Sequence, residues 1–376
     1  MPSMTVSRVE CRVFRVPIEN PVKTSFGTMT SRPALFLRVS AEDGAWGWGE
    51  VFCNFPQVGA EHRARLVDSL FAPLLQGGPT DDPPRNRERL EARVRKLAIQ
   101  CGEPGPFAQI VGAIDQALWD MAGRRAGQPL WKLLATGPEG GNRVQVYASG
   151  LGPEDVARTA LGKRDEGYRA FKFKVGFGAQ KDLANFAEIR AALGDDAVVM
   201  VDANQAWSPD EAAKRIAELA PFRPHWVEEP IAADEPIPQW EELARRCGVP
   251  LAAGENLRGL DEFADVLTSE CLAFVQPDVA KWGGLSGCRD VALLARRHGA
   301  IFCPHWLGGG VGLAASLHLR AAMGPEGYAE VDANPNPLRE ELFMPSPRDG
   351  WVTLPDAPGL GVEPDVARLE KYRVGY

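Results

Sequence analysis

Ionisable side chains follow the short apolar runs in the second half of the sequence, at the point where each run ends. Seven consecutive runs supply them: Lys172, Lys174, Asp202, Glu228, Glu255, Asp278, His305 and Glu330. The carboxyl ends of the strands of a parallel barrel meet at one mouth, and barrel enzymes carry their reacting groups there. One or two charged ends would be uninformative, but ionisable residues at the ends of seven consecutive runs predict an active site.

Three of these side chains are carboxylates at the ends of successive runs, namely Asp202, Glu228 and Glu255. Taken singly, each is most often a solvated loop charge, but three converging carboxylates repel one another unless a cation lies between them. Oxygen ligands with room for water select a hard divalent ion. The set therefore predicts a site for Mg²⁺, with Mn²⁺ as the alternative. Because side chains alternate along a strand, Glu229 is expected to face away from this site.

Two lysines and an aspartate–histidine pair are suited to moving protons at such a site. Lys172 and Lys174 lie two residues apart, so they share one face of a strand. A cation and a second lysine lower the pKa of a lysine, as a general base needs near neutral pH. Asp278 and His305 end neighbouring runs, where an aspartate can orient an imidazole and raise its basicity. Glu330, on the last run, is a candidate for a protonated acid that donates to an oxyanion.

The elements that position these residues form a regular series of short apolar runs alternating with helical stretches. Eight runs lie roughly 23–30 residues apart, the length of one strand–helix unit with its loops. They are RVQVYASG (143–150), RAFKFKV (169–175), AVVMVDAN (197–204), HWVEEP (225–230), PLAAGEN (250–256), FVQPDVAK (274–281), AIFCPHW (300–306) and YAEVDAN (328–334). This number and spacing predict a parallel barrel rather than an open sheet.

The residues before this series predict a different architecture. Strands are expected at 5–16, 34–39 and 45–51, and helices at about 60–75, 84–100 and 109–127. Strands followed by helices indicate an α+β domain. The closing residues are too rich in Pro and Gly for another barrel unit, so we expect them to pack on the first domain. The predicted organisation is a capping domain at 1–128, a barrel at 129–350 and a closing segment at 351–376.

Composition and charge limit the classes of function. Of the 376 residues, 45% are hydrophobic and 24% are charged, as in an ordinary globular protein. A net charge of −8 and the lack of a basic run argue against nucleic-acid binding. The seven cysteines have no CxxC spacing, so neither a zinc site nor a disulfide scaffold is expected. The sequence starts without the apolar core of a signal peptide and has no run of membrane-spanning length, so we expect a cytoplasmic protein without membrane contact.

Taken together, these motifs identify a family resemblance that covers nearly the whole chain. The chain resembles the enolase superfamily, and within it the mandelate racemase subgroup. The matching motifs are KFK (172–174), VDAN (201–204), VEEP (227–230), GEN (254–256), QPDVAKWGG (276–284), PHW (304–306), AEVD (329–332), WGWGE (46–50), the helix at 114–134 and PDAPGLGVE (355–363). The resemblance implies a modified TIM barrel, (β/α)7β, with an N-terminal α+β capping domain completed by the C-terminal segment.

The resemblance also implies a chemistry. Members of this superfamily bind a substrate carboxylate on Mg²⁺ and abstract the proton on its α-carbon, which gives an enediolate. Carried over by position, Lys174 is the base on one face, and His305, oriented by Asp278, is the acid or base on the other. Lys172 contacts the carboxylate, and Glu330 donates to the enolate oxygen. The expected partner is therefore a small-molecule carboxylate, and relatives often form homo-oligomers.

Two positions decide the subgroup, and two outcomes remain open within it. Relatives of the muconate cycloisomerase type place a lysine where this chain has Asp278, and they lack a catalytic histidine at His305. Lys281, three residues after Asp278, fits a turn and is expected to be structural. Dehydration of an acid sugar to a 2-keto-3-deoxy acid is the favoured reaction. Racemisation or epimerisation of a 2-hydroxy acid or related carboxylate on the same two bases is the alternative.

Specificity in this family comes largely from two loops of the first domain, expected here at 20–29 and 51–59. They offer Lys23 and Asn54, and we count Asn204 and Trp306 with them as candidate substrate-binding residues. The loops also contain several aromatic residues, so the mouth is less polar than a long polyhydroxy acid requires. A short or partly apolar substrate is therefore an open alternative.

Overall fold

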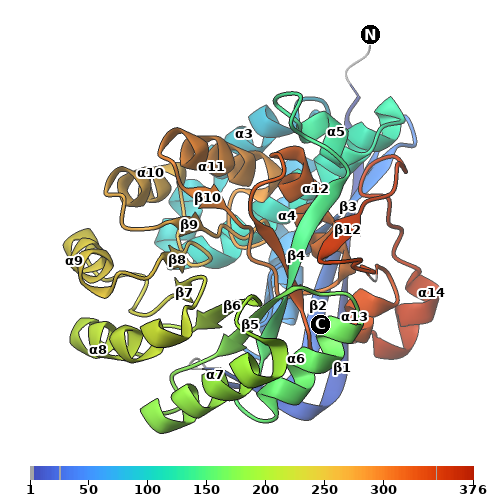
Figure 1. The fold of residues 1–376 in the computed structure, drawn as a ribbon. Coiled ribbons are helices and arrows are strands. Elements are labelled where there is room, and N and C mark those ends of the chain that lie inside the picture. Colours follow the sequence, from blue (N-terminus) through green and yellow to red (C-terminus); the bar gives the residue numbers. More distant parts are fainter. Residues whose placement is uncertain (1–3, 25–26, 344) are drawn as a thin grey trace.

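The computed structural model describes residues 4–24, 27–343 and 345–376. A capping sheet of three antiparallel strands lies beside the barrel (Figure 1), and its order is β1 (Val6–Thr24), β2 (Gly27–Ala41) and β3 (Trp46–Val51). The first two strands are longer than the sequence predicts, because β1 continues past Pro17 after a register shift between Pro17 and Val22. The expected loop at 20–29 is therefore largely the end of a long hairpin.

The helices of the capping domain follow the sheet. They are α1 (Gly59–Leu66), a π-helical turn (Val67–Phe71), α2 (Ala72–Leu75), α3 (Pro83–Gln100) and α4 (Pro104–Ala126). The two glycines of the WGWGE motif let α4 approach β3, because a Cβ on Gly49 would lie only 1.9 Å from the carbonyl oxygen of Ala113, and one on Gly47 2.0 Å from that of Ala117. This close contact brings the end of β3 near the barrel mouth.

The second part of the chain is a nearly closed barrel of eight parallel strands, as predicted. The strands are β4 (Arg143–Leu151), β5 (Ala170–Lys174), β6 (Val198–Asp202), β7 (Val227–Glu228), β8 (Leu251–Ala253), β9 (Phe274–Val275), β10 (Ile301–Phe302) and β11 (Tyr328–Asp332). Their hydrogen-bonded order runs from β10 back to β4 and then to β11. The helices between them are α6 (Val156–Asp165), α7 (Ala179–Leu193), α8 (Pro209–Leu219), α9 (Ile237–Cys247), α10 (Leu260–Thr268), α11 (Gly284–Arg297) and α12 (Gly310–Ala322). The (β/α)7β fold with its capping domain is confirmed.

Side-chain alternation along the strands separates two layers. The inner layer fills the barrel below its mouth with Tyr147, Ala170, Met200, Trp226, Ala252, Phe274 and Cys303. The outward residues of β5 pack on the helices, and the rings of Phe173 and Phe186 lie 5.2 Å apart. This apolar floor leaves the polar residues of each strand end at the mouth.

The C-terminal segment contacts both parts of the molecule. Its first strand, β12 (Trp351–Thr353), pairs antiparallel with β4. Further along, the Leu360 amide donates to Asp120 Oδ1 at 2.8 Å, and the Val374 amide donates to the Val13 carbonyl oxygen at 3.0 Å. The segment therefore begins on the barrel and ends on the capping domain (Figure 1). Among the residues that the structure describes, no helix is long and apolar enough to cross a bilayer.

Candidate active site

Lys172 lies at the base of the barrel mouth and joins three strands. Its side chain is 1% exposed, and its Nζ lies 2.9 Å from Glu330 Oε1 and 3.7 Å from Asp202 Oδ2, with a hydrogen bond to Glu228. Burial acts to lower the pKa of Lys172, but Glu228 and Glu330 raise it well above its ordinary value. The lysine is therefore a fixed positive charge, suited to holding an anionic oxygen.

Lys174 lies two residues further along β5, nearer the solvent. Its Nζ donates to Asp202 Oδ2 at 2.7 Å and to Asn204 Oδ1 at 2.6 Å. Burial opposes protonation, but the Asp202 carboxylate raises the pKa of Lys174. This is opposite to the predicted direction. The prediction assumed that a cation holds Asp202, whereas here the carboxylate is paired with the lysine itself.

Asp278 and His305 form the pair that the sequence predicts. His305 Nδ1 lies 2.6 Å from Asp278 Oδ2, and the other carboxylate oxygen of Asp278 accepts the Ala280 amide at 2.7 Å. An ionised aspartate at this distance keeps the proton on Nδ1, so Nε2 is the nitrogen available to substrate. Burial opposes it, but Glu255, Glu330 and Asp278 raise the pKa of His305 well above its ordinary value. The imidazole is thereby held as a proton donor.

Three buried carboxylates, Asp202, Glu228 and Glu255, stand at the ends of β6 and β7 and just after β8. Each accepts a hydrogen bond from a neighbouring side chain: Asp202 from Lys174, Glu228 from Gln276 Nε2 at 2.6 Å, and Glu255 from Lys281. Burial raises the pKa of Glu228 to about 7, although Lys172 opposes this. Because of these pairings, no group of three acidic, histidine or cysteine side chains within the described ranges has the geometry of a ready-made metal site.

The charges around the mouth nevertheless suit a divalent cation. Six carboxyl groups and four basic groups lie at the mouth or directly behind it: Asp202, Glu228, Glu229, Glu255, Asp278, Glu330, Lys172, Lys174, Lys281 and His305. The carboxyl groups outnumber the basic groups, and the possible metal ligands among them are oxygens. This is the donor set that Mg²⁺ prefers.

Glu330, at the centre of β11, faces the same cavity. It accepts hydrogen bonds from the Ser149 hydroxyl and, at 2.9 Å, from the Trp306 amide, and it pairs with Lys172. Burial opposes ionisation, but Lys172 and His305 lower the pKa of Glu330. The prediction of a protonated Glu330 is therefore not met in this arrangement. Ser149, which holds one of its oxygens, was not singled out in the sequence because a serine carries no distinctive signal.

Lys281, predicted to be structural, points into the site instead. Its Nζ donates to Glu255 Oε2 at 2.7 Å and lies 4.7 Å from the centre of the Phe52 ring in the capping domain. Glu255 Oε2 is also 2.8 Å from His305 Nε2. The spacing KxGG indicated only a turn, and the long side chain that reaches back from this turn is what the sequence analysis missed.

Glu229 faces away from the mouth, as strand alternation predicts, yet it is buried beside the metal-binding candidates. Its oxygens accept from Gln205 Nε2 at 3.0 Å and from Asn256 Nδ2 at 2.7 Å. Burial and the neighbouring Glu255 raise the pKa of Glu229 to about 8. Glu229 thus places a second buried acidic group behind Glu255, outside the lining of the cavity.

The cavity between the two domains has a polar floor and a largely apolar rim. Its lining residues are Val22, Phe52, Asn54, Phe55, Ser149, Gly150, Lys174, Asp202, Asn204, Glu255, Lys281, His305, Leu307, Glu330 and Asn334. Lys174, Asp202, Glu255, His305 and Glu330, all predicted, are thus brought together. Lys172 and Asp278 contact them from below.

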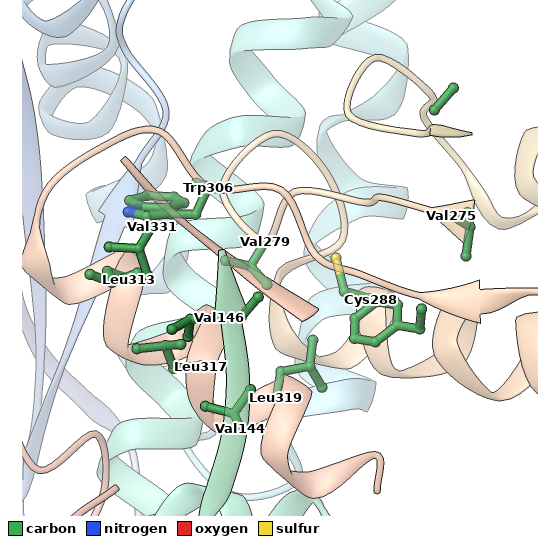
Figure 2. Close-up of a cluster of buried hydrophobic side chains, with 14 of the residues drawn as sticks. Val144, Val146, Val275, Val279, Cys288, Trp306, Leu313, Leu317, Leu319 and Val331 are labelled. Carbon is green, nitrogen blue, oxygen red and sulfur yellow. The ribbon is translucent and has the colours of Figure 1, made fainter. Parts of the chain in front are cut away.

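The four candidate substrate-binding residues lie in different environments. Asn204 and Asn54 line the cavity, and the Asn54 amide also donates to the Leu307 carbonyl oxygen. The indole of Trp306 instead lies in the hydrophobic core beside Leu313 and Val331 (Figure 2), with its Nε1 donating to the Gly309 carbonyl oxygen at 3.0 Å. The side chain of Lys23 lies outside the part that the structure describes.

Comparisons with known proteins agree with this geometry. Residues 8–135 match the mandelate racemase/muconate lactonizing enzyme N-terminal domain, and residues 155–368 match the enolase C-terminal domain-like family. The D-galactarolactone cycloisomerase of Agrobacterium fabrum is 30% identical over 99% of both chains. The L-talarate/galactarate dehydratase of Salmonella typhimurium is 30% identical over 89% of this chain and 81% of its own.

Two solved structures superpose on nearly the whole chain. A mandelate racemase/muconate lactonizing enzyme from Bordetella bronchiseptica is 45% identical, with a TM-score of 0.90 and coverage of 98% of this chain and 99% of its own. An enolase from Bradyrhizobium, complexed with magnesium and mandelic acid, is 28% identical, with a TM-score of 0.87 and full coverage of both chains. The chain therefore belongs to the mandelate racemase/muconate lactonizing enzyme family of the enolase superfamily.

Proposed function

We propose that this protein is a Mg²⁺-dependent enzyme that abstracts the proton α to a carboxylate and dehydrates an acid sugar to a 2-keto-3-deoxy acid. One observation carries the proposal. Lys174 and the Asp278-held His305, two groups that can exchange protons, line the same cavity as the carboxylates of Asp202 and Glu255. Relatives named as galactarate and galactonate dehydratases support the choice of reaction.

Asp202, Glu228 and Glu255 would hold the metal, and the magnesium in the Bradyrhizobium structure supports this assignment. Bound there, the ion would supply positive charge beside the substrate carboxylate. It would also compete with Lys174 for Asp202, the carboxylate that raises the pKa of this lysine. The protein side chains then carry the proton transfers.

The proton steps follow from the positions of the side chains. Lys174 Nζ takes the proton from the α-carbon. The electron pair of the broken carbon–hydrogen bond moves toward the substrate carboxylate, and the positive charge of Lys172 stabilises the carboxylate oxygen. His305 Nε2 gives its proton to the hydroxyl on the next carbon. The carbon–oxygen bond breaks, water leaves, and the enol that remains tautomerises to the 2-keto acid. Asp278 stabilises the charged imidazole and fixes its orientation throughout.

A second reaction remains a candidate because of the rim of the cavity. Val22, Phe52, Phe55 and Leu307 present apolar surface to the substrate. A compact, partly apolar 2-hydroxy acid fits this rim better than a long polyol. On such a substrate, His305 would return a proton to the opposite face of the α-carbon, which racemises or epimerises it. The mandelic acid bound in the Bradyrhizobium structure supports this candidate.

Proton NMR in D₂O distinguishes the two reactions. The protein is incubated with MgCl₂ and, separately, galactarate, L-talarate, D-galactonate, (R)-mandelate and (S)-mandelate. A 2-keto product from one sugar acid supports the dehydratase. Deuterium at the α-carbon without loss of water supports the racemase or epimerase. Neither signal with any acid would contradict the proposed substrate classes, and a loss of exchange on adding EDTA is expected in both positive cases.

A further inference from the structure

We propose that Glu50 and Gln116 of the capping domain are positioning residues for the Asp278–His305 pair. This inference rests on the proposed function, in which His305 gives a proton to the leaving hydroxyl or, in the second candidate reaction, exchanges the α-proton on its own face of the substrate. Neither residue touches the cavity, and both are fully buried between the two domains. Their hydrogen bonds reach the backbone that follows Asp278 and the backbone that follows His305, and these bonds fix the positions of the two residues.

Glu50 holds the loop that carries His305. This loop joins β10 to α12, and the two Glu50 oxygens accept from the Gly309 amide at 2.6 Å and from the Gly312 amide at 2.9 Å. A Cβ on Gly309 would lie 2.7 Å from Glu50 Oε1, so the glycine is what permits this approach. Asn54, from the same domain, donates to the Leu307 carbonyl oxygen. The capping domain thus forms hydrogen bonds with this loop at Leu307 and Gly309, two and four residues after His305.

Gln116 connects Glu50 to the backbone beside Asp278, the other member of the pair. Its Oε1 accepts from the Glu50 amide at 3.2 Å, and its Nε2 donates to the Val279 carbonyl oxygen at 3.0 Å. Val279 directly follows Asp278. A single buried side-chain amide on α4 therefore joins β3, the strand that carries Glu50, to the turn that carries Asp278. Glu50 thus holds the backbone that follows His305, and Gln116 holds the backbone that follows Asp278, the two residues that meet in the 2.6 Å contact.

The backbone after Lys174 is held in the same manner, but by a residue of the barrel domain itself. Asp182, in the first turn of α7, accepts from the Gly176 amide at 2.9 Å and from the Phe177 amide at 3.3 Å. A buried carboxylate thus grips the loop after each proton-transferring residue, Glu50 for His305 and Asp182 for Lys174. Asp182→Asn is therefore a matched control for Glu50→Gln.

The test compares two proton exchanges in one protein. In D₂O with MgCl₂, α-deuteration is measured for each member of two pairs that differ in configuration at C2, the enantiomers (R)- and (S)-mandelate and the epimers galactarate and L-talarate. Lys174→Ala and His305→Asn assign each stereoisomer to its base. Glu50→Gln keeps the side-chain size but places an NH₂ group against a backbone amide. We expect it to lower the rate on the His305 face by about 10²-fold, the cost of a displacement near 1 Å. The rate on the Lys174 face should stay within about twofold.

The ratio of the two rates separates positioning from general damage. An unfolded fraction lowers both rates by the same factor, so the ratio reports geometry alone. Asp182→Asn should change the ratio in the opposite direction. Gln116→Leu should change it as Glu50→Gln does, and this variant decides the matter if Glu50→Gln does not fold. An unchanged ratio in the folded variants would overturn the proposal.

A measurement without substrate keeps the inference distinct from the proposed function. The hydrogen-bonded Nδ1 proton of His305 should give a downfield NMR resonance, assigned by its loss in His305→Asn. We expect Glu50→Gln to shift or broaden this resonance and Asp182→Asn to leave it in place. If the wild-type protein exchanges none of the acids, the proposed function fails while this readout still decides the positioning. An identical resonance in Glu50→Gln and wild type would refute it.

Discussion

His305 Nδ1 lies 2.6 Å from Asp278 Oδ2, and this contact leaves Nε2 as the only ring nitrogen that faces the cavity lining. Replacing Asp278 by asparagine removes the charge that stabilises the imidazolium. We expect Asp278→Asn to slow proton transfer on the His305 face by about 10²–10⁴-fold. Because Asp278 contributes to the raised pKa of His305, the pH profile of this exchange should also move to lower pH. Rates measured across pH check both effects, with the exposed Asp195→Asn as control; an unmoved profile would contradict the assignment.

Lys174→Arg tests the base on the other face. Arginine keeps the positive charge beside Asp202 but does not release its proton at accessible pH. The expected result is a loss of α-proton exchange on the Lys174 face by about 10²–10⁴-fold, with the fold intact. Circular dichroism establishes the fold, and deuterium incorporation gives the rate. Exchange at the wild-type rate in this variant would show that another group is the base.

Glu255→Gln tests the metal-binding assignment without relying on turnover. Removal of one of three oxygen ligands should weaken Mg²⁺ binding by at least about tenfold. Isothermal titration calorimetry measures this directly, and the Mg²⁺-dependent increase in melting temperature should shrink in parallel because a ligand stabilises only the state that binds it. Glu241→Gln, on the exposed side of α9, is the control. Equal Mg²⁺ affinity in the two variants would contradict the proposed site.

Asp115 on α4 makes the stability of the fold dependent on pH. It accepts from the Ser286 hydroxyl at 2.6 Å and the Ser286 amide at 2.9 Å, yet burial raises its pKa to about 7. Its stabilising contribution is complete below the unfolded-state pKa of about 3.9 and is lost as the pH rises to the folded-state pKa. In that interval one proton is worth about 1.4 kcal/mol per pH unit.

Asp115→Asn should therefore flatten the fall in unfolding free energy between about pH 5 and pH 7. Urea unfolding at several pH values measures it. A residual slope is expected, because burial also raises the pKa of Glu50 and of Glu229, each to about 8. A slope as steep as that of the wild type would show that Asp115 is ionised in the folded state.

The sequence predicted what depends on strand periodicity and on the position of strand ends. Asp202, Glu228 and His305 follow from the rule that barrel strands converge at their carboxyl ends. Lys281 was misjudged because its side chain leaves a turn and reaches back to Glu255, a path that no periodicity encodes. Trp306 was misjudged for the opposite reason, since its neighbour His305 faces the cavity while its own ring turns into the core. The sequence also could not indicate which lysine pairs with which carboxylate, because these side chains become neighbours only when the strands close into a barrel.

The contacts from Glu50 and Gln116 to the barrel loops limit how this protein can be recombined with its relatives. A chimera that takes its first 135 or so residues from one homologue and its barrel from another exchanges the rim of the cavity, which is the purpose of such an experiment. It also exchanges the groups that grip the Gly309 amide and the Val279 carbonyl oxygen. Altering specificity by domain exchange therefore requires that these interdomain hydrogen bonds be transplanted together with the rim.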